Sequence, residues 1–260
     1  MKIAYLGFDL FFECLQYLAD TNEIVKIFTC EVDGNYEKNE LTYALAKEKN
    51  IPITPKRITA SDIDSLEKAG CDLIISAGYY FKIPVSDNIK SINIHPSLLP
   101  EGRGPWPLPV IILKGINESG VTAHRIAENF DEGEIVLQKK ISVCANENLE
   151  TLTQKMKQCA LMVVTELSQN IEFYWNTRTV QNGGSYWKEP SVKDMSFTLK
   201  CDFEYVDKIT RAFYGYKSFL KNDEETKEIV YAVCVESKSD IPTLSKEVFE
   251  LNKGYLCILK

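Results

Sequence analysis

The amino-acid sequence predicts an α/β protein with a doubly wound, mostly parallel open sheet and a small β-rich C-terminal domain. Residues 2–7 and 72–78 are short, near-continuous apolar runs. Strands of this kind are covered on both faces, as in parallel sheets. Segments with apolar residues at helical spacing lie between the predicted strands. Because strands and helices alternate along the chain, an open sheet wound with helices is expected.

The first half of the chain alternates strands and helices. Apolar residues recur at helical spacing over 9–19, and residues 40–49 are rich in Ala, Leu, Glu and Lys. Ser61 is expected to begin a capped helix, with Asp62 in the first turn, where acidic side chains are favoured. The expected elements are strand 2–7, helix 9–19, strand 24–28, helix 40–49, a helix from 61, strand 72–78 and strand 91–95.

The pattern changes after residue 105. Residues 182–185 (Asn-Gly-Gly-Ser) are typical of a linker. We therefore expect a catalytic domain over 1–180 and a small domain over 181–260. The remaining expected elements are helix 107–114, strands 120–127 and 134–143, a long helix over about 149–175, helix 203–213, and strands near 229–236 and 254–259.

Composition narrows the class of protein. The chain has 260 residues, of which 45% are hydrophobic, enough for a sizeable core, and its formal net charge of −7 disfavours non-specific nucleic-acid binding. No run approaches the eighteen apolar residues of a membrane span, and the N-terminus lacks a targeting leader, so we expect a cytoplasmic protein without membrane partners. Eight scattered cysteines without Cys-x-x-Cys, together with only two histidines, argue against a metal site.

Polar residues at the end of the strand over 91–95 are the main candidates for chemistry. Asn93 and His95 are two residues apart, so on a strand they share a face, and Pro96 stops the ladder just after them. Asp131 lies in a loop before another strand and could return to the same edge. Ligands of doubly wound sheets bind beyond the carboxyl ends of the strands.

An amide donor, an imidazole and a carboxylate suit acyl transfer to an amine without a covalent intermediate. Asn93 could donate to the oxyanion, and His95 could stabilise it and shuttle the proton. Asp131 could orient His95, raise the pKa of its ring and help move a proton through water. By residue type alone, however, a structural role for each of the three stays open.

Three stretches resemble the formyltransferase family. They are Ser91–Pro100 with Arg103-Gly104, Gly120-Val121-Thr122-Ala123-His124, and Asp131-Glu132-Gly133-Glu134-Ile135. The resemblance covers about residues 72–145 sharply and the flanking residues up to 215 more loosely. It implies a formyltransferase-type Rossmann-like fold, a reduced, OB-like C-terminal domain, 10-formyltetrahydrofolate as co-substrate, and Asn93, His95 and Asp131 as the catalytic residues.

The resemblance also implies where the folate binds. The pterin would lie between the loop after strand 72–78 and the loop before Asp131, with Phe81 and Ile83 as an apolar wall. The cofactor-binding candidates are Tyr80, Phe81, Lys82, Ile83, Glu128 and Phe130; for the aromatic residues of the first loop, a core role is equally open. Arg103 could contact a substrate phosphate or carboxylate, or could be a solvated charge of the loop. Trp106 could line the acceptor pocket, or could be a surface residue that anchors its loop. His124 is expected to be a structural histidine, or one that supports the catalytic residues from behind, rather than a catalyst.

The acceptor amine is less well defined by the sequence. Residues 190–260 hold 11 Lys and Arg against 12 Asp and Glu, a net charge of −1, whereas an RNA-binding tail should be basic. We therefore expect a small amine, first of all a nucleotide-linked amino sugar, with methionyl-tRNA as the alternative. A homodimer is compatible with this assignment.

Two other classes of function stay open. One is a hydrolase that releases formate from formyl-folate, with water as the acceptor. The other is a non-catalytic folate-binding or partner-binding module. Measuring tetrahydrofolate release with and without an amine discriminates among a transferase, a hydrolase and a binding module.

Overall fold

The computed structural model describes residues 1–32, 37–222 and 225–259. The chain forms two compact units, each made of segments that are separate in sequence. Unit 1 contains Met1–Pro105, Ser119–Ile141 and Lys155–Tyr186, and unit 2 contains Trp106–Glu118, Ser142–Gln154 and Trp187–Lys260. The functional division at residue 180 stays a prediction.

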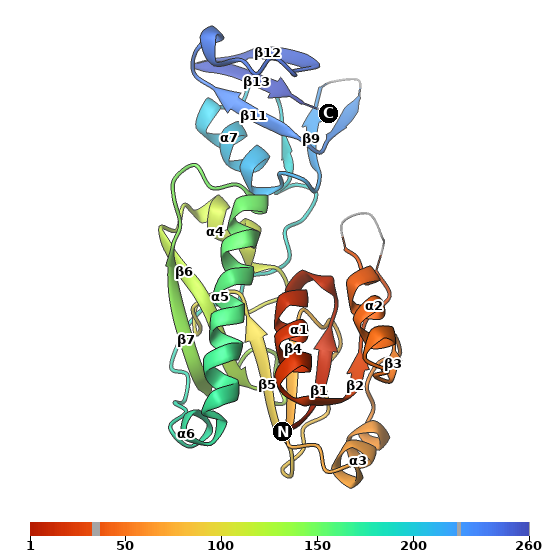
Figure 1. Cartoon of the computed structure of the whole chain (residues 1–260). Helices are drawn as coiled ribbons and strands as arrows, with labels where there is room; N and C mark the ends of the chain where they lie inside the picture. Colours follow the sequence, from red (N-terminus) through yellow and green to blue (C-terminus); the bar gives the residue numbers. More distant parts are fainter. Residues whose placement is uncertain (33–36, 223–224, 260) are drawn as a thin grey trace. The chain divides into compact units, whose positions relative to one another are not determined.

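Unit 1 is built on a seven-stranded sheet with the strand order β3-β2-β1-β4-β5-β6-β7 (Figure 1). The neighbours among β1 to β5 pair in parallel, and β5 pairs with β6 antiparallel. The predicted doubly wound, mostly parallel α/β fold is confirmed. The strands are β1 (Lys2–Gly7), β2 (Glu23–Phe28), β3 (Ile53–Thr54), β4 (Leu73–Ala77), β5 (Lys90–His95), β6 (Glu118–Arg125) and β7 (Ile135–Ser142).

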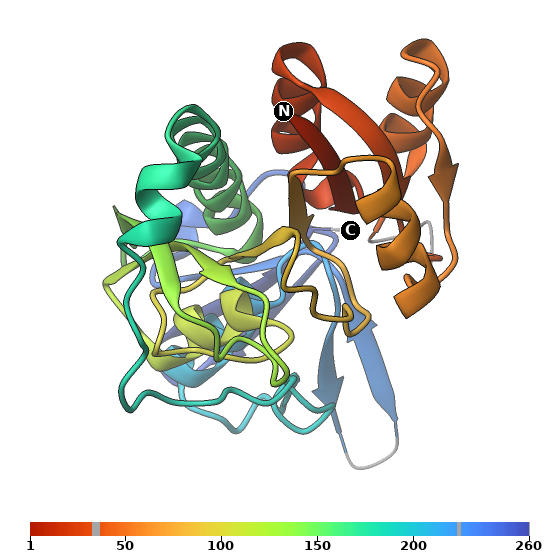
Figure 2. The same cartoon turned by 90° about the horizontal axis from the view of Figure 1, so that it is seen from below.

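Helices connect the parallel strands. The chain runs outward from β1 through β2 to β3 and then crosses back to β4. Because such crossovers are right-handed, the helix of the returning connection packs on the opposite face, and Figure 2 shows α1 and α3 on different sides of the first strands. Among the described residues, no helix is both long and apolar enough to cross a lipid bilayer. The helices between the parallel strands are α1 (Phe12–Thr21, after a short 3-10 turn Asp9–Phe11), α2 (Glu40–Glu48) and α3 (Ala60–Lys68). Two further helices, α5 (Leu149–Gln169) and α6 (Ile171–Asn176), follow β7.

Two helix boundaries differ from the sequence prediction. α3 begins earlier, because Thr59 and Asp62 form a reciprocal capping box in which each side chain accepts from the other's backbone N–H. The expected single helix over 149–175 is two helices, α5 and α6, separated at Asn170, whose φ is −139°. Asparagine disfavours helix interiors because its side chain competes for backbone hydrogen bonds.

A substitution at the centre of the sheet is expected to reduce stability more than one at the surface. Ile74 of β4 has 0% exposure and lies in a buried cluster with Leu6, Phe28 and Ile63. We expect Ile74→Ala to lower the free energy of unfolding by about 2–5 kcal/mol, because the lost contacts leave a cavity. Urea unfolding followed by circular dichroism measures this. Leu41→Ala, at a 51% exposed position of α2, is the matched control; a cost for Ile74→Ala no larger than the control's would contradict the prediction.

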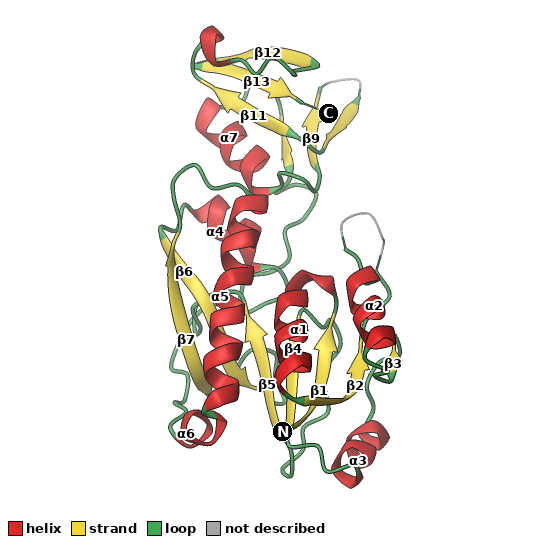
Figure 3. Cartoon of the chain, in the orientation of Figure 1, coloured by secondary structure: helices red, strands yellow, loops and turns green. Residues whose placement is uncertain are grey.

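Unit 2 combines two helices with two small sheets (Figure 3). α7 (Phe203–Ala212) is amphipathic and buries Val206, Ile209 and Ala212. The strand orders are β10-β9-β8 and β11-β13-β12, which confirms the expected small, β-rich C-terminal part. The further elements are α4 (Pro107–Lys114), β8 (Ser196–Phe197), β9 (Ser218–Lys221), β10 (Thr226–Ile229), β11 (Ala232–Val235), β12 (Glu247–Leu251) and β13 (Gly254–Ile258), with a 3-10 turn at Lys238–Asp240.

Candidate active site

The carboxyl end of β5 presents polar side chains in unit 1. Asn93 and His95 share one face of the strand because they are two residues apart. β6 runs antiparallel beside it, and its register places His124 directly opposite Asn93. His95 and His124 are 5% and 2% exposed, so both imidazoles are held in a nearly dry environment.

Asp131, in the loop between β6 and β7, brings a carboxylate to these groups. Its Oδ1 lies 3.6 Å from His95 Nδ1, 3.4 Å from His124 Nε2 and 3.4 Å from Asn93 Nδ2. Its Oδ2 accepts the backbone N–H of Gly104 at 2.9 Å. The structure therefore brings Asn93, His95 and Asp131 together from two separate stretches of chain.

The hydrogen bonds of His95 define which ring nitrogen is available. Nε2 lies 2.8 Å from the carbonyl oxygen of Gly102. Because a carbonyl can only accept, Nε2 carries the hydrogen, and in the neutral ring Nδ1 is then the basic atom. That basic nitrogen faces Asp131.

Burial and charge set the protonation states of the pair. Burial alone raises the pKa of Asp131, but the His95 and His124 rings and the Gly104 N–H outweigh it and lower the pKa to about 2. Burial lowers the pKa of His95 below its usual 6.5, and the charge of Asp131 opposes this only in part. At neutral pH the site thus holds an ionised carboxylate next to a neutral imidazole that can accept a proton.

Asn93 and His124 form a second contact within the site. The Asn93 Nδ2 lies 3.1 Å from His124 Nε2, and His124 Nδ1 lies 2.9 Å from the carbonyl oxygen of Arg125. His124 Nδ1 therefore donates to Arg125, and Nε2 accepts from Asn93. The amide nitrogen expected to meet an oxyanion is engaged with His124 and Asp131 in this structure.

His124 lies directly behind Asn93 and Asp131, a position compatible with the structural or supporting role expected from the sequence. Its place follows from the antiparallel register of β5 and β6, which is a non-local property. The available signal was a histidine within an otherwise apolar and small-residue strand, since the chain has only 2 histidines.

The residues expected to bind folate lie in two loops. Phe81 is 36% exposed and stacks edge-on against Tyr79 with ring centroids 5.5 Å apart, and Phe130 is 56% exposed. Ile83 is only 6% exposed and packs in the core cluster, so its side chain is part of the fold rather than an open wall. Tyr80 hydrogen-bonds Glu37 and packs near Phe8. The exposed charged members are Lys82 and Glu128.

The two residues expected to meet the acceptor both have partners within the chain. The guanidinium of Arg103 donates to the side-chain oxygen of Gln181 and to the carbonyl of Gly183. The Trp106 ring lies edge-on to Phe213 and Tyr216, with centroids 5.9 and 4.9 Å away. Binding of an acceptor by either residue stays a prediction.

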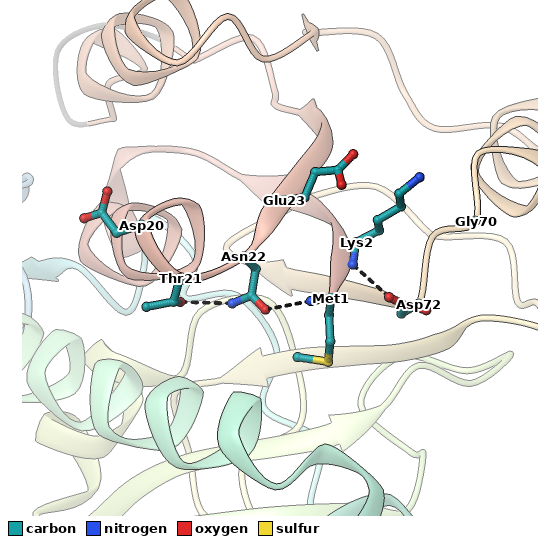
Figure 4. A pocket seen from close by; sticks show the side chains of 8 residues that line it. All are labelled: Met1, Lys2, Asp20, Thr21, Asn22, Glu23, Gly70 and Asp72. Atoms are coloured by element: carbon teal, nitrogen blue, oxygen red, sulfur yellow. Dashed lines mark hydrogen bonds between the residues drawn. The ribbon is translucent and has the colours of Figure 1, made fainter.

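An open hollow of about 720 Å³ lies elsewhere in unit 1 (Figure 4). It is lined at the amino ends of β1 and β2 by Met1, Lys2, Asp20, Thr21, Asn22, Glu23, Gly70 and Asp72. Ligands of doubly wound sheets bind at the opposite, carboxyl end, so the group around His95 is the candidate active site and this hollow is not. Across residues 1–32, 37–222 and 225–259, no group of three or more His, Cys, Asp or Glu side chains is arranged to hold a metal ion.

A doubly wound α/β unit with a buried imidazole and carboxylate at the carboxyl end of a central strand is suited to general acid–base chemistry on a bound ligand. A family profile described as formyl transferase matches residues 20–166, more than half of the chain. The chain therefore belongs to the formyl transferase family and is a formyl-transferring enzyme.

Known proteins resemble the chain over most of its length. The methionyl-tRNA formyltransferase of Ehrlichia chaffeensis is 26% identical over 253 residues, which cover 91% of this chain and 82% of the relative. An N-formyltransferase from Helicobacter canadensis, solved with folinic acid and dTDP-3-aminofucose, has a similar structure with a TM-score of 0.72 at 19% identity, covering 100% of this chain and 99% of that chain. HypX from Aquifex aeolicus matches with a TM-score of 0.76 at 18% identity; 99% of this chain aligns, but it spans only 45% of HypX.

Proposed function

We propose that this enzyme transfers the formyl group of 10-formyltetrahydrofolate to the amine of a nucleotide-linked amino sugar, with Asn93, His95 and Asp131 as catalytic residues. The observation that carries the proposal is the basic Nδ1 of His95, which lies 3.6 Å from the Asp131 carboxylate. The formyl donor supplies an activated amide carbonyl, and the amine attacks its carbon. The amine must then lose a proton, and the departing nitrogen must gain one.

His95 is suited to carry that proton. Its ring is neutral at pH 7 because burial lowers its pKa, so Nδ1 can accept a proton from the attacking amine. The imidazolium that forms faces the ionised Asp131, which stabilises it, while Gly102 keeps the ring oriented through Nε2. His95 can then return the proton to the leaving nitrogen.

Asn93 is suited to stabilise negative charge on the formyl oxygen. One of its amide hydrogens is directed at Asp131 across 3.4 Å, which is longer than an ordinary hydrogen bond. A substrate oxygen that bears developing charge is a better acceptor at a normal distance. His124 holds the same amide group from the other side at 3.1 Å.

The residues present also fit a reduced folate. Phe81 and Phe130 expose aromatic surface on the loops that follow β4 and β6. Ile83, within the loop after β4, and Ile126, directly after β6, belong to one hydrophobic cluster, so both loops are anchored to the same part of the core. Apolar walls with a few polar groups are typical of small-molecule sites, and the ring systems of a folate could cover these aromatic side chains.

A sugar nucleotide is the favoured acceptor for two reasons. The Helicobacter canadensis enzyme, described with dTDP-3-aminofucose, aligns with this chain end to end. The segment over 190–260, with 11 basic against 12 acidic residues, lacks the positive charge that tRNA binding requires. Methionyl-tRNA is the second candidate, because sequence relatives such as the Ehrlichia chaffeensis protein bear that name.

The acceptor can be identified by incubating the full chain and 10-formyltetrahydrofolate with dTDP-linked 3-amino or 4-amino sugars, with methionyl-tRNA, or with no acceptor. We expect tetrahydrofolate release and a formylated sugar only with an amino sugar, and nearly the same rate in 50 and 200 mM salt. The affinity for tRNA would instead fall about 10³–10⁵-fold over this salt range if 6–10 phosphates were contacted.

Each other outcome contradicts a stated part of the proposal. Formylation of tRNA with a steep salt dependence would replace the acceptor. Release without any amine would indicate a hydrolase. No release with any acceptor, despite folate binding that raises the melting temperature, would indicate a binding module.

A further inference from the structure

A segment that looks like a linker in the sequence is attached to both loops of the active site. We call residues 179–186 the strap. At one end, Thr179 and Ile135 exchange backbone hydrogen bonds of 2.8 and 2.9 Å. At the other end, Tyr186 forms a parallel β-bridge with Arg103. The strap therefore belongs to the ordered structure of unit 1.

Gln181 is the centre of the strap. Its Nε2 donates to the carbonyl oxygens of Asp131, at 2.8 Å, and Gly133, at 2.7 Å. Its Oε1 accepts from Nε and Nη2 of Arg103, at 3.0 and 2.9 Å. Both amide hydrogens and both acceptor positions of this half-buried side chain are used, so it bridges two loops with its full hydrogen-bonding capacity.

The first of these loops holds Asp131 in an unfavourable conformation. Asp131 has a φ of 57°, in the left-handed region that favours glycine, although aspartate adopts it more readily than most other residues. Gly133 fits only as glycine, because a Cβ there would lie 1.8 Å from the carbonyl oxygen of Arg125. A conformation of this kind persists only where surrounding contacts stabilise it, and Gln181 binds the carbonyls at both of these positions.

The second loop, residues 100–104, orients the side chains of both His95 and Asp131. Its Gly102 carbonyl accepts from His95 Nε2, and its Gly104 N–H donates to Asp131 Oδ2. The strap holds this loop through Arg103, whose N–H donates to the Ser185 carbonyl at 3.0 Å. The loop that orients the base and the loop that supplies the carboxylate are thus joined through one glutamine.

We propose that Gln181 is a positioning residue, which holds the Asp131 loop and the Gly102 loop together so that carboxylate and imidazole face each other. Its role in transfer rests on the proposed function. Its effect on the His95–Asp131 geometry does not, and that effect can be measured without any substrate.

The test is a double-mutant cycle read by NMR titration of the His95 imidazole, which is simple to assign because the chain has only 2 histidines. Since Asp131 raises the pKa of His95, Asp131→Asn should lower it. In the Gln181→Met background, where the Asp131 loop is released, this effect should shrink to less than about half. In parallel, kcat for transfer should fall about 10–100-fold in Gln181→Met, with the acceptor KM within about threefold.

Two further variants control for folding. Gln158→Met, at an exposed position of α5, should leave kcat and the His95 titration unchanged. Gln181→Glu keeps an acceptor for Arg103 but loses both N–H donors, so it should reproduce the reduced coupling even if Gln181→Met folds poorly. An Asp131→Asn effect of equal size in all folded backgrounds would overturn the proposal. The titration gives this answer whether or not any acceptor is formylated.

Discussion

Asp131→Asn is expected to lower kcat/KM for formyl transfer by about 10²–10⁴-fold while the protein stays folded. In the proposed mechanism the carboxylate stabilises the imidazolium of His95, 3.6 Å away, and its second oxygen accepts the N–H of Gly104. A neutral amide removes the charge. If its NH2 group occupies the place of Oδ1, it also donates to the basic Nδ1 of His95, and thereby blocks the proton acceptor.

Steady-state rates and a thermal melt of the same preparations measure this effect. Asp64→Asn, at an exposed position of α3, is the matched control and should retain the wild-type rate. If Asp131→Asn kept a rate within about threefold of the Asp64→Asn control, the carboxylate would have no role in transfer.

The sequence predicts the parts of this site that follow from local patterns. β1 and β4 are recognisable because strands buried on both faces are continuous apolar runs. Asn93 and His95 share a face because the strand period is two, and Pro96 marks the end of the strand. The order of the elements allowed Asp131 to return to the same edge, and the family resemblance implied that it does; the structure places its carboxylate 3.6 Å from His95.

The contacts that sequence reasoning did not predict join distant segments of the chain. His124 meets Asn93 only because β5 and β6 pair antiparallel in one register. Gln181 reaches Asp131 from 50 positions away in the chain, in a stretch whose Asn-Gly-Gly-Ser composition indicates a linker. For Ile83, the sequence predicts a side chain in contact with the ligand, but the side chain packs among core residues. Periodicity cannot report such contacts, because it describes only one element at a time.

His95 is the proposed proton carrier. We expect His95→Gln to lower kcat by about 10²–10⁴-fold, because glutamine cannot shuttle a proton. The wild-type ring should titrate below pH 6.5, since burial lowers its pKa. The sign of the pH dependence follows: the neutral base predominates at pH 7 and is lost as the pH falls through the pKa of His95 in the folded protein. An acid limb of kcat from this group should therefore lie below pH 6.5.

NMR titration of the two imidazoles measures this pKa directly, and the spectrum of His95→Gln identifies the remaining His124 signal. His124→Gln is the second comparison, because it keeps the His95 base and should retain more activity than His95→Gln. A His95 ring that titrates above pH 6.5 would be protonated over part of the neutral range. Such a result, or a His95→Gln enzyme as fast as His124→Gln, would assign the proton transfer to another group.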